Sequence, residues 1–154
     1  MKKSLGTAIF ALIVTLAMSP MISVAADTGG GANGGKPPKP QLATKLVDGA
    51  GGTVGHAGYG SKTNKDGKTF SKLGVKLEHL TLAVDTKLTV RVNDAIVGSA
   101  TVKAGPKGGA CAELVLDSAK GDIVPTVSDG SSIAVQLADG ISVASGTFHK
   151  PPKQ

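Results

Sequence analysis

Apolar and polar residues alternate along most of the chain after about residue 42. In KLTVRVN, Leu88, Val90 and Val92 share one side of an extended chain. The same period of two recurs in KLGVKLEH (72–79), ACAELVLD (110–117) and SIAVQLA (132–138). Because side chains of a strand point alternately to its two faces, this period predicts strands with one buried face.

Turn signals separate these segments. Asp66-Gly67, Asp129-Gly130 and Asp139-Gly140 are tight-turn pairs, and Asn93-Asp94 lies between two expected strands. We expect strands near 42–47, 53–60, 69–79, 86–93, 96–103, 110–116, 131–138 and 141–148. Beyond position 26, no segment has the long apolar periodicity of a helix. The pattern therefore predicts one all-β domain over 42–149, an antiparallel β-sandwich or small barrel of about eight strands.

Two details refine this prediction. Tyr59, Phe70 and Phe148 are the domain's only aromatic residues, so Val, Leu, Ile and Ala must build its core. Near the end, Ile141 and Val143 differ in parity from Phe148. We expect a bulge around Ser145-Gly146 to bring them to one face.

Five short motifs follow one another along the expected domain, and similar motifs occur in the same order in other proteins. Leu-x-Val-x-Val-Asn, Val-Gly-x-x-x-Val, Leu-x-Leu-Asp-Ser, Gly-Asp-x-Val-Pro and Ala-Ser-Gly-Thr-Phe follow one another between about Gly55 and Phe148. This run resembles uncharacterised β-rich domains of secreted bacterial proteins. The shared positions are turn and core positions, so the resemblance implies a secreted β-sandwich and implies no active site.

The segment 1–26 has the pattern of a secretory signal peptide. Lys2 and Lys3 precede an apolar run, and small residues follow near Ala25 and Ala26, where cleavage is expected. The run is too short for an ordinary membrane anchor, which needs roughly 20 apolar residues. We expect a secreted protein, extracellular or periplasmic, that is not an integral membrane protein after cleavage.

Positive charge is concentrated outside the expected domain. The chain has 17 basic and 11 acidic residues. Without Lys2 and Lys3, the balance is 15 against 11, a net charge of +4, of which the domain carries only +1. Residues 27–41 form a Gly/Pro/Lys linker and residues 150–154 a Pro/Lys tail, and each contains Lys-Pro-Pro-Lys. We interpret both as solvated spacers, with weak attraction to an anionic polymer as the alternative.

One segment of the domain is strongly basic. Five lysines lie between positions 62 and 76: Lys62, Lys65, Lys68, Lys72 and Lys76. They either form a solvated outer face that discourages edge-to-edge pairing or bind an anionic polysaccharide or other envelope polymer. Export and the scarcity of base-stacking aromatic residues argue against nucleic acid.

Other chemistry is sparse. His56, which we expect to point outward, His79, which we expect half-buried at a strand end, and His149 lack metal-ligand spacing, so we expect no metal and no cofactor. TNKDG (63–67) is expected to be a turn rather than a calcium loop, because Lys65 lies inside it. Cys111 has no internal partner and shares parity with Glu113. It is either a half-buried strand residue or a thiol for intermolecular pairing.

These observations favour a non-enzymatic, exported module with a structural or adhesive role at the cell envelope or in the extracellular matrix. Its expected partners are an anionic envelope polymer or another envelope protein. The alternative is a ligand-binding module that uses the lysine-rich segment. An enzyme is the third hypothesis. Nucleophile-elbow, phosphate-loop and dinucleotide motifs are absent from the sequence, so its site would have to be assembled from distant residues.

Overall fold

The computed structural model describes residues 39–106 and 108–152. The expected signal peptide, the expected linker as far as position 38, and positions 153 and 154 therefore lie outside the described residues. The strands are β1 (Leu42–Val47), β2 (Thr53–Thr63), β3 (Thr69–Leu80), β4 (Lys87–Val92), β5 (Ala95–Thr101), β6 (Lys103–Ala104), β7 (Ala110–Asp117), β8 (Ser132–Leu137) and β9 (Ser142–Thr147), with a short 3-10 turn, η1 (Ser118–Lys120).

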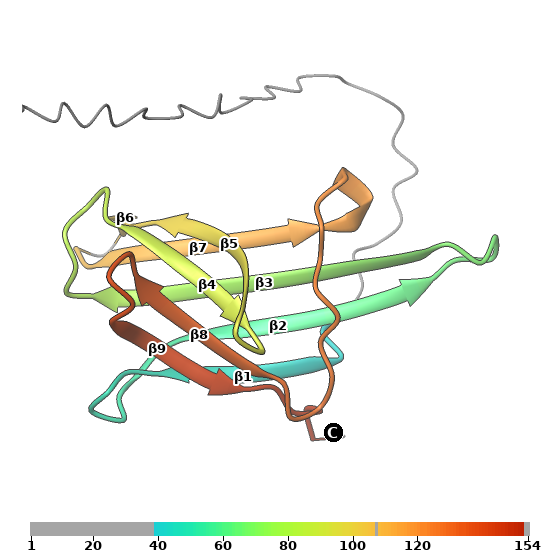
Figure 1. Cartoon of the computed structure of the whole chain (residues 1–154), viewed down its shortest axis with the longest axis horizontal. Coiled ribbons are helices and arrows are strands. Elements are labelled where there is room, and N and C mark those ends of the chain that lie inside the picture. Colours follow the sequence, from blue (N-terminus) through green and yellow to red (C-terminus); the bar gives the residue numbers. More distant parts are fainter. Residues whose placement is uncertain (1–38, 107, 153–154) are drawn as a thin grey trace, which may run out of the picture. The chain divides into compact units, whose positions relative to one another are not determined.

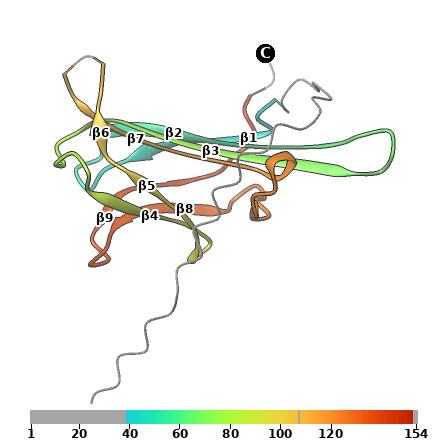
Figure 2. The same cartoon turned by 90° about the horizontal axis from the view of Figure 1, so that it is seen from above.

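These strands form one antiparallel sheet in the order β5-β4-β8-β9-β1-β2-β3-β7-β6. The sheet curls so that β5, at one edge, contacts β7, next to the other edge. In the view from above, β4, β8 and β9 lie opposite β1, β2, β3 and β7 (Figures 1 and 2). The predicted all-β fold is confirmed as a nearly closed, barrel-like sheet. Within the described residues, no helix is long and apolar enough to cross a membrane.

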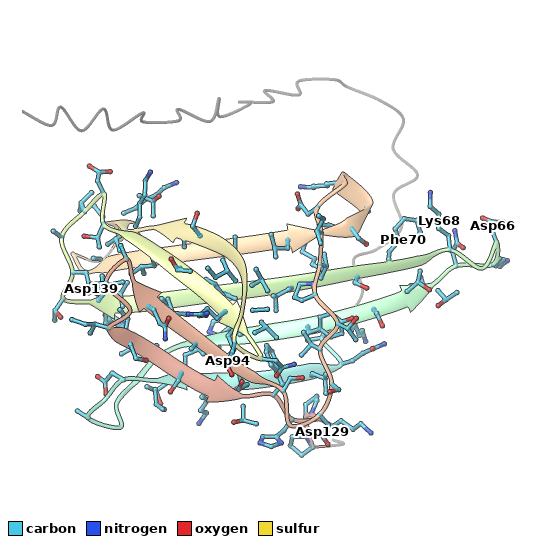
Figure 3. All side chains as sticks on the ribbon, viewed as in Figure 1. Asp66, Lys68, Phe70, Asp94, Asp129 and Asp139 are labelled. Atoms are coloured by element: carbon cyan, nitrogen blue, oxygen red, sulfur yellow. The ribbon has the colours of Figure 1, made fainter. Side chains whose placement is uncertain are left out.

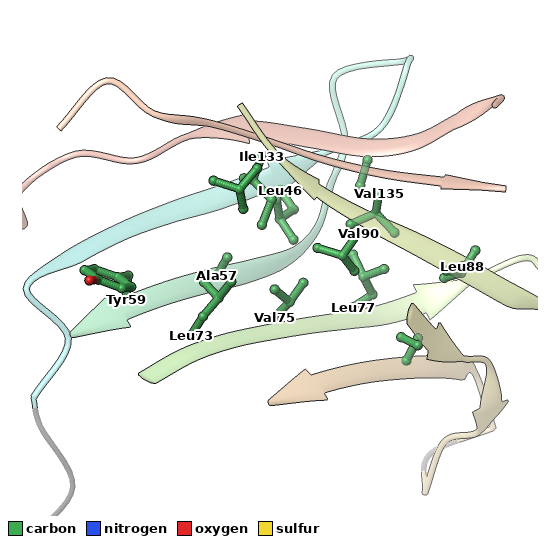
Figure 4. Close-up of a cluster of buried hydrophobic side chains, with 14 of the residues drawn as sticks. Leu46, Ala57, Tyr59, Leu73, Val75, Leu77, Leu88, Val90, Ile133 and Val135 are labelled. Carbon is green, nitrogen blue, oxygen red and sulfur yellow. The ribbon is translucent and has the colours of Figure 1, made fainter. Parts of the chain in front are cut away.

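Aliphatic side chains fill the inside of this sheet, as the composition predicted. The alternating residues of β3 and β4 point inward, and Leu73, Leu88 and Val90 are fully buried. Figure 4 shows them converging with residues of β1, β2 and β8. Phe148 is also fully buried and follows β9 directly. Burial of apolar surface from all parts of the sheet is therefore the main contribution to the stability of its curled form.

Strand positions agree closely with the sequence pattern, although β2 runs past the expected end at 60 to Thr63. Two further differences follow. β6 is a ninth, very short strand, because the segment expected at 96–103 is interrupted at Val102, which is fully buried. The bulge expected around Ser145-Gly146 was placed wrongly. The irregularity in β9 is at Val143, since Val135 pairs with Ala144 and Gln136 with Ser142. Ala144 thereby shares the buried face with Phe148, and Ile141 is left 61% exposed.

The expected turns are present. Asn93 and Asp94 have φ values of 47° and 65° and join β4 to β5, as a type I′ hairpin turn requires. Gly130 and Gly140 also have positive φ. Because Asn, Asp and Gly tolerate this region, local sequence and sheet geometry agree at these positions.

Candidate functional site

The hairpin formed by β2 and β3 extends beyond the strands that flank it. Pairing of β1 with β2 reaches only Tyr59, and pairing of β7 with β3 reaches only Lys72. Beyond these points, the segments 61–63 and 69–71 pair only with each other in the sheet. Figures 1 and 3 show this end projecting from the sheet. We call residues 61–71 the projecting hairpin.

Asn64 organises the turn at the tip of the projecting hairpin. Its side-chain oxygen accepts hydrogen bonds from the backbone N–H groups of Asp66 (3.1 Å) and Lys68 (2.8 Å). Its amide nitrogen donates to the carboxylate of Asp66 at 3.2 Å. Gly67, with φ of 76°, takes the left-handed position that such a short loop needs. Residues 63–67 therefore contain the hydrogen-bonded turn that the sequence predicted.

Three of the five lysines lie on the projecting hairpin. Lys62, Lys65 and Lys68 are exposed, and none of them forms an ion pair with another residue that the structure describes. The ammonium group of Lys68 lies 5.8 Å from the ring centroid of Phe70, a cation–π distance (Figure 3). Asp66 is the only acidic residue on the hairpin, so its tip carries a net positive charge.

The other two lysines lie on the sheet, and carboxylates accompany them. Lys72 Nζ is 3.8 Å from Asp117 Oδ2, across the β3–β7 pair. Lys76 Nζ is 2.8 Å from Glu78 Oε1. The hydrogen bond and charge of Lys76 lower the pKa of the Glu78 carboxyl, and the same contact raises the pKa of Lys76. The structure thus separates the basic segment into an uncompensated tip and a compensated sheet face.

A shallow groove of about 290 Å³ lies on this sheet face. Gly58 and Gly74 are directly paired there, so no side chain fills the space between Lys72 and Lys76. Pro40 borders the groove, because it lies 3.6 Å from the point where a Cβ of Gly58 would stand. The groove is lined by glycines and by side chains of both charges. Because Lys72 and Lys76 have carboxylate partners, the groove is less positive than the projecting hairpin.

The histidines do not converge. His56 is exposed on β2, as expected, and His149 Nδ1 is 3.2 Å from Asp129 Oδ1. The expectation that His79 is half-buried was wrong. Glu78 and His79 together lie opposite Cys111, so the pairing shifts and Leu80 takes the buried position. His79 is exposed with φ of 56°. Among the described residues, no three His, Cys, Asp or Glu side chains are placed to hold a metal ion.

Cys111 is half-buried on the outer side of β7. It lines a small hollow of about 190 Å³ together with His79, Gly105 and Gly109. The Cys111 thiol therefore lies outside the core, beside the point where the register between β3 and β7 shifts. The predicted alternatives, a strand residue or a thiol for intermolecular pairing, both fit this position.

Sequence reasoning did not foresee two features of this region. The first is the pairing of Lys72 with Asp117, which are distant in the chain and adjacent only through the β3–β7 register. The second is the turn-forming role of Asn64, although an Asn shortly before Asp-Gly is a known turn signal. Comparison with protein-family models, with curated proteins and with solved structures gave no match.

Proposed function

We propose that this protein is an exported, non-enzymatic β-module that attaches to an anionic polymer of the cell envelope through its projecting hairpin. Its role is structural or adhesive, and the place of action is outside the cytoplasm, in the periplasm or the extracellular space. Export is inferred from the N-terminal sequence alone.

One observation carries this proposal: Lys62, Lys65 and Lys68 lie together on a hairpin tip that has no ion-pair partner among the described residues. A projecting basic element can reach a polymer that the body of the domain would not touch. Exposed lysines attract polyanions over about a Debye length, which is roughly 8 Å at physiological salt. Lys72 and Lys76 contribute less, because Asp117 and Glu78 already offset their charge.

The test compares two triple variants that remove equal charge. Lys62→Gln/Lys65→Gln/Lys68→Gln removes the tip lysines, and Lys45→Gln/Lys87→Gln/Lys103→Gln removes three exposed lysines on other strands. Retention on immobilised heparin and teichoic acid is measured at rising salt. We expect the tip variant to lose at least about tenfold in affinity at low salt, and the matched variant to lose much less.

Equal losses by the two triple variants would show that only net charge matters and would overturn the hairpin assignment. Failure of the wild-type protein to bind either polymer would overturn the whole proposal. A third variant, Lys72→Gln/Lys76→Gln, should fall nearer to wild type than the tip variant does, since each of these lysines has a carboxylate partner.

A further inference from the structure

The groove and the projecting hairpin lie on one continuous face of β2 and β3. Residues that are directly paired across two strands share a face of the sheet, and the same face returns at every second residue. On the outer face of the β2–β3 pair, four rows of paired residues therefore follow one another: His56–Lys76, Gly58–Gly74, Gly60–Lys72 and Lys62–Phe70. The last row belongs to the projecting hairpin, about 13 Å along the strand from the glycine row.

The glycine row leaves a gap in this face. Lys72 and Lys76 stand two residues to either side of Gly74. No atom lies within 4 Å of the point where a Cβ of Gly74 would stand, and Pro40 forms an apolar wall beside Gly58. This gap is the groove of about 290 Å³. Its volume is near the lower end of the range for small-ligand sites, so it has room for a small part of a larger ligand.

The rim of the groove offers both hydrogen-bond donors and acceptors. Lys72, Lys76 and His56 supply donors, and the carboxylate of Glu113 supplies acceptors. Glu113 is exposed and is paired directly with Lys76 across β3 and β7. A carboxylate at the rim repels a purely anionic ligand. A hydroxyl group, in contrast, both donates and accepts hydrogen bonds. The groove therefore suits a polyhydroxylated ligand better than a bare phosphate chain.

Phe70 adds an aromatic ring to the same face. Its side chain is half-buried, whereas the other aromatic side chains of the described residues, Tyr59 and Phe148, are buried in the core. The negative face of an aromatic ring attracts C–H groups, such as those of a sugar ring. Lys68 Nζ lies 5.8 Å from the Phe70 ring centroid, and Lys62 is paired directly with Phe70. Positive charge thus flanks the aromatic ring that lies outside the core.

We propose that this face binds the sugar rings of a linear polysaccharide, one ring in the groove and another on Phe70, while Lys62 and Lys68 bind its anionic substituents. The inference rests on the proposed function and deepens it, because it identifies the anionic polymer as a polysaccharide. One extended chain can reach both positions, since they are about 13 Å apart along β3. Such a chain gains affinity from both contacts, because the second contact is intramolecular.

The experiment uses the full chain and two polyanions: a heparin oligosaccharide, which has sugar rings, and long-chain polyphosphate, which has none. Gly74→Ile fills the groove and Phe70→Leu removes the aromatic ring, and neither substitution changes the charge. Ser145→Ile is the matched control, because it adds the same side chain at an exposed position of β9. Glu113→Gln keeps the size of the side chain and removes its negative charge. Calorimetry measures the affinities, and thermal unfolding checks that each variant is folded.

We expect Gly74→Ile, Phe70→Leu and Glu113→Gln each to weaken binding of the heparin oligosaccharide about three- to tenfold, as expected for the loss of one ring contact or hydrogen bond. Gly74→Ile and Phe70→Leu should leave polyphosphate binding unchanged. Glu113→Gln should bind polyphosphate as tightly as wild type or more tightly, because a repulsive charge is gone. Ser145→Ile should bind both probes as wild type does.

Two results would overturn the inference. Equal losses for both probes in Gly74→Ile and Phe70→Leu would show that this face does not distinguish sugar rings from other polyanions. Tighter binding of the heparin oligosaccharide by Glu113→Gln would show that the carboxylate only repels the ligand and makes no hydrogen bond to it.

The hairpin triple variant separates this inference from the proposed function. If it loses heparin affinity while the Gly74, Phe70 and Glu113 variants bind as wild type does, the polysaccharide assignment is refuted and the proposed function stands. The same holds if the wild-type protein binds polyphosphate but not heparin. If the groove variants lose affinity and the hairpin triple variant does not, attachment through the hairpin is refuted and the groove contact stands. If the wild-type protein binds neither probe, both proposals fail.

Discussion

Glycines on β2 and β3 meet opposite environments. A Cβ at Gly55 would lie 2.1 Å from the carbonyl oxygen of Lys76 and 2.9 Å from the Cα of Leu77. No atom lies within 4 Å of the corresponding position at Gly74, whose φ is not in the left-handed region. Both glycines lie in strands. Of the two, only Gly55 has to be a glycine, because a neighbouring backbone approaches it too closely for a side chain.

This contrast predicts opposite effects of the same substitution. Gly55→Ala should lower the free energy of unfolding by about 2–3 kcal/mol, because backbone atoms must move to admit the methyl group. Gly74→Ala should leave it unchanged or raise it by up to about 1 kcal/mol, because alanine has less conformational freedom in the unfolded chain. Urea unfolding of both variants measures the difference. Similar changes at the two positions would contradict this account.

At the scale of elements, the β2–β3 hairpin combines two parts of different stability. Near Ala57 and Val75, β2 and β3 have further strands on both sides and bury their inner faces. In the projecting hairpin, the backbone pairs across the hairpin only, and most side chains are exposed or half-exposed. The contacts of Gln41 with Ser61, and of Ser118 Oγ with the Ser71 N–H at 2.8 Å, support only the hairpin's base.

The amides of the projecting hairpin should therefore exchange with solvent faster than those in the middle of the same strands. We expect hydrogen exchange at Thr63 and Thr69 to occur by local opening, with less protection than at Ala57 and Val75. NMR-detected exchange gives these rates. Asn64→Ala should accelerate exchange at the tip and leave the centre of β3 unaffected. Uniform protection along both strands would show that something else holds the tip.

For the whole molecule, stability and the proposed binding surface depend on different residues. The core consists of aliphatic residues and Phe148 inside the curled sheet. Exposed lysines that lack an ion-pair partner among the described residues lie on the projecting hairpin and also on other strands, at Lys45, Lys87 and Lys103. Lys39, Lys150, Pro151 and Pro152 are exposed and belong to no strand. The tails can thus contribute charge without contributing much buried surface.

Removing the tails should accordingly have little effect on thermal stability. We expect a chain that lacks residues 27–39 and 150–154 to melt within about 2 °C of the full chain, because the sequence of these segments offers almost no apolar side chains to bury. Pro40 is retained in this variant, since it packs over Gly58. Calorimetry compares the two melting temperatures. A loss of several degrees would mean that a tail packs against the domain.

The sequence by itself determined the strands, their inner faces and the turns, because these depend on near neighbours in the chain. The alternation in β3 and β4, the Asn93-Asp94 turn and the aliphatic core were all predictable. The exposure of His79 was not, because the shift in β3–β7 pairing depends on a strand that follows much later in the chain. The sequence also located the five lysines without indicating which of them are neutralised.

Only the tertiary structure decided how distant charges meet. The strand register pairs Lys72 with Asp117 and leaves the tip lysines uncompensated. The Ala43–His149 bridge places His149 beside β1, although more than a hundred residues separate the two in the chain. Hydrophobic patterning specifies which face of a strand is buried, but many strand orders satisfy the same pattern. The order of strands in the sheet therefore sets which charges share a surface.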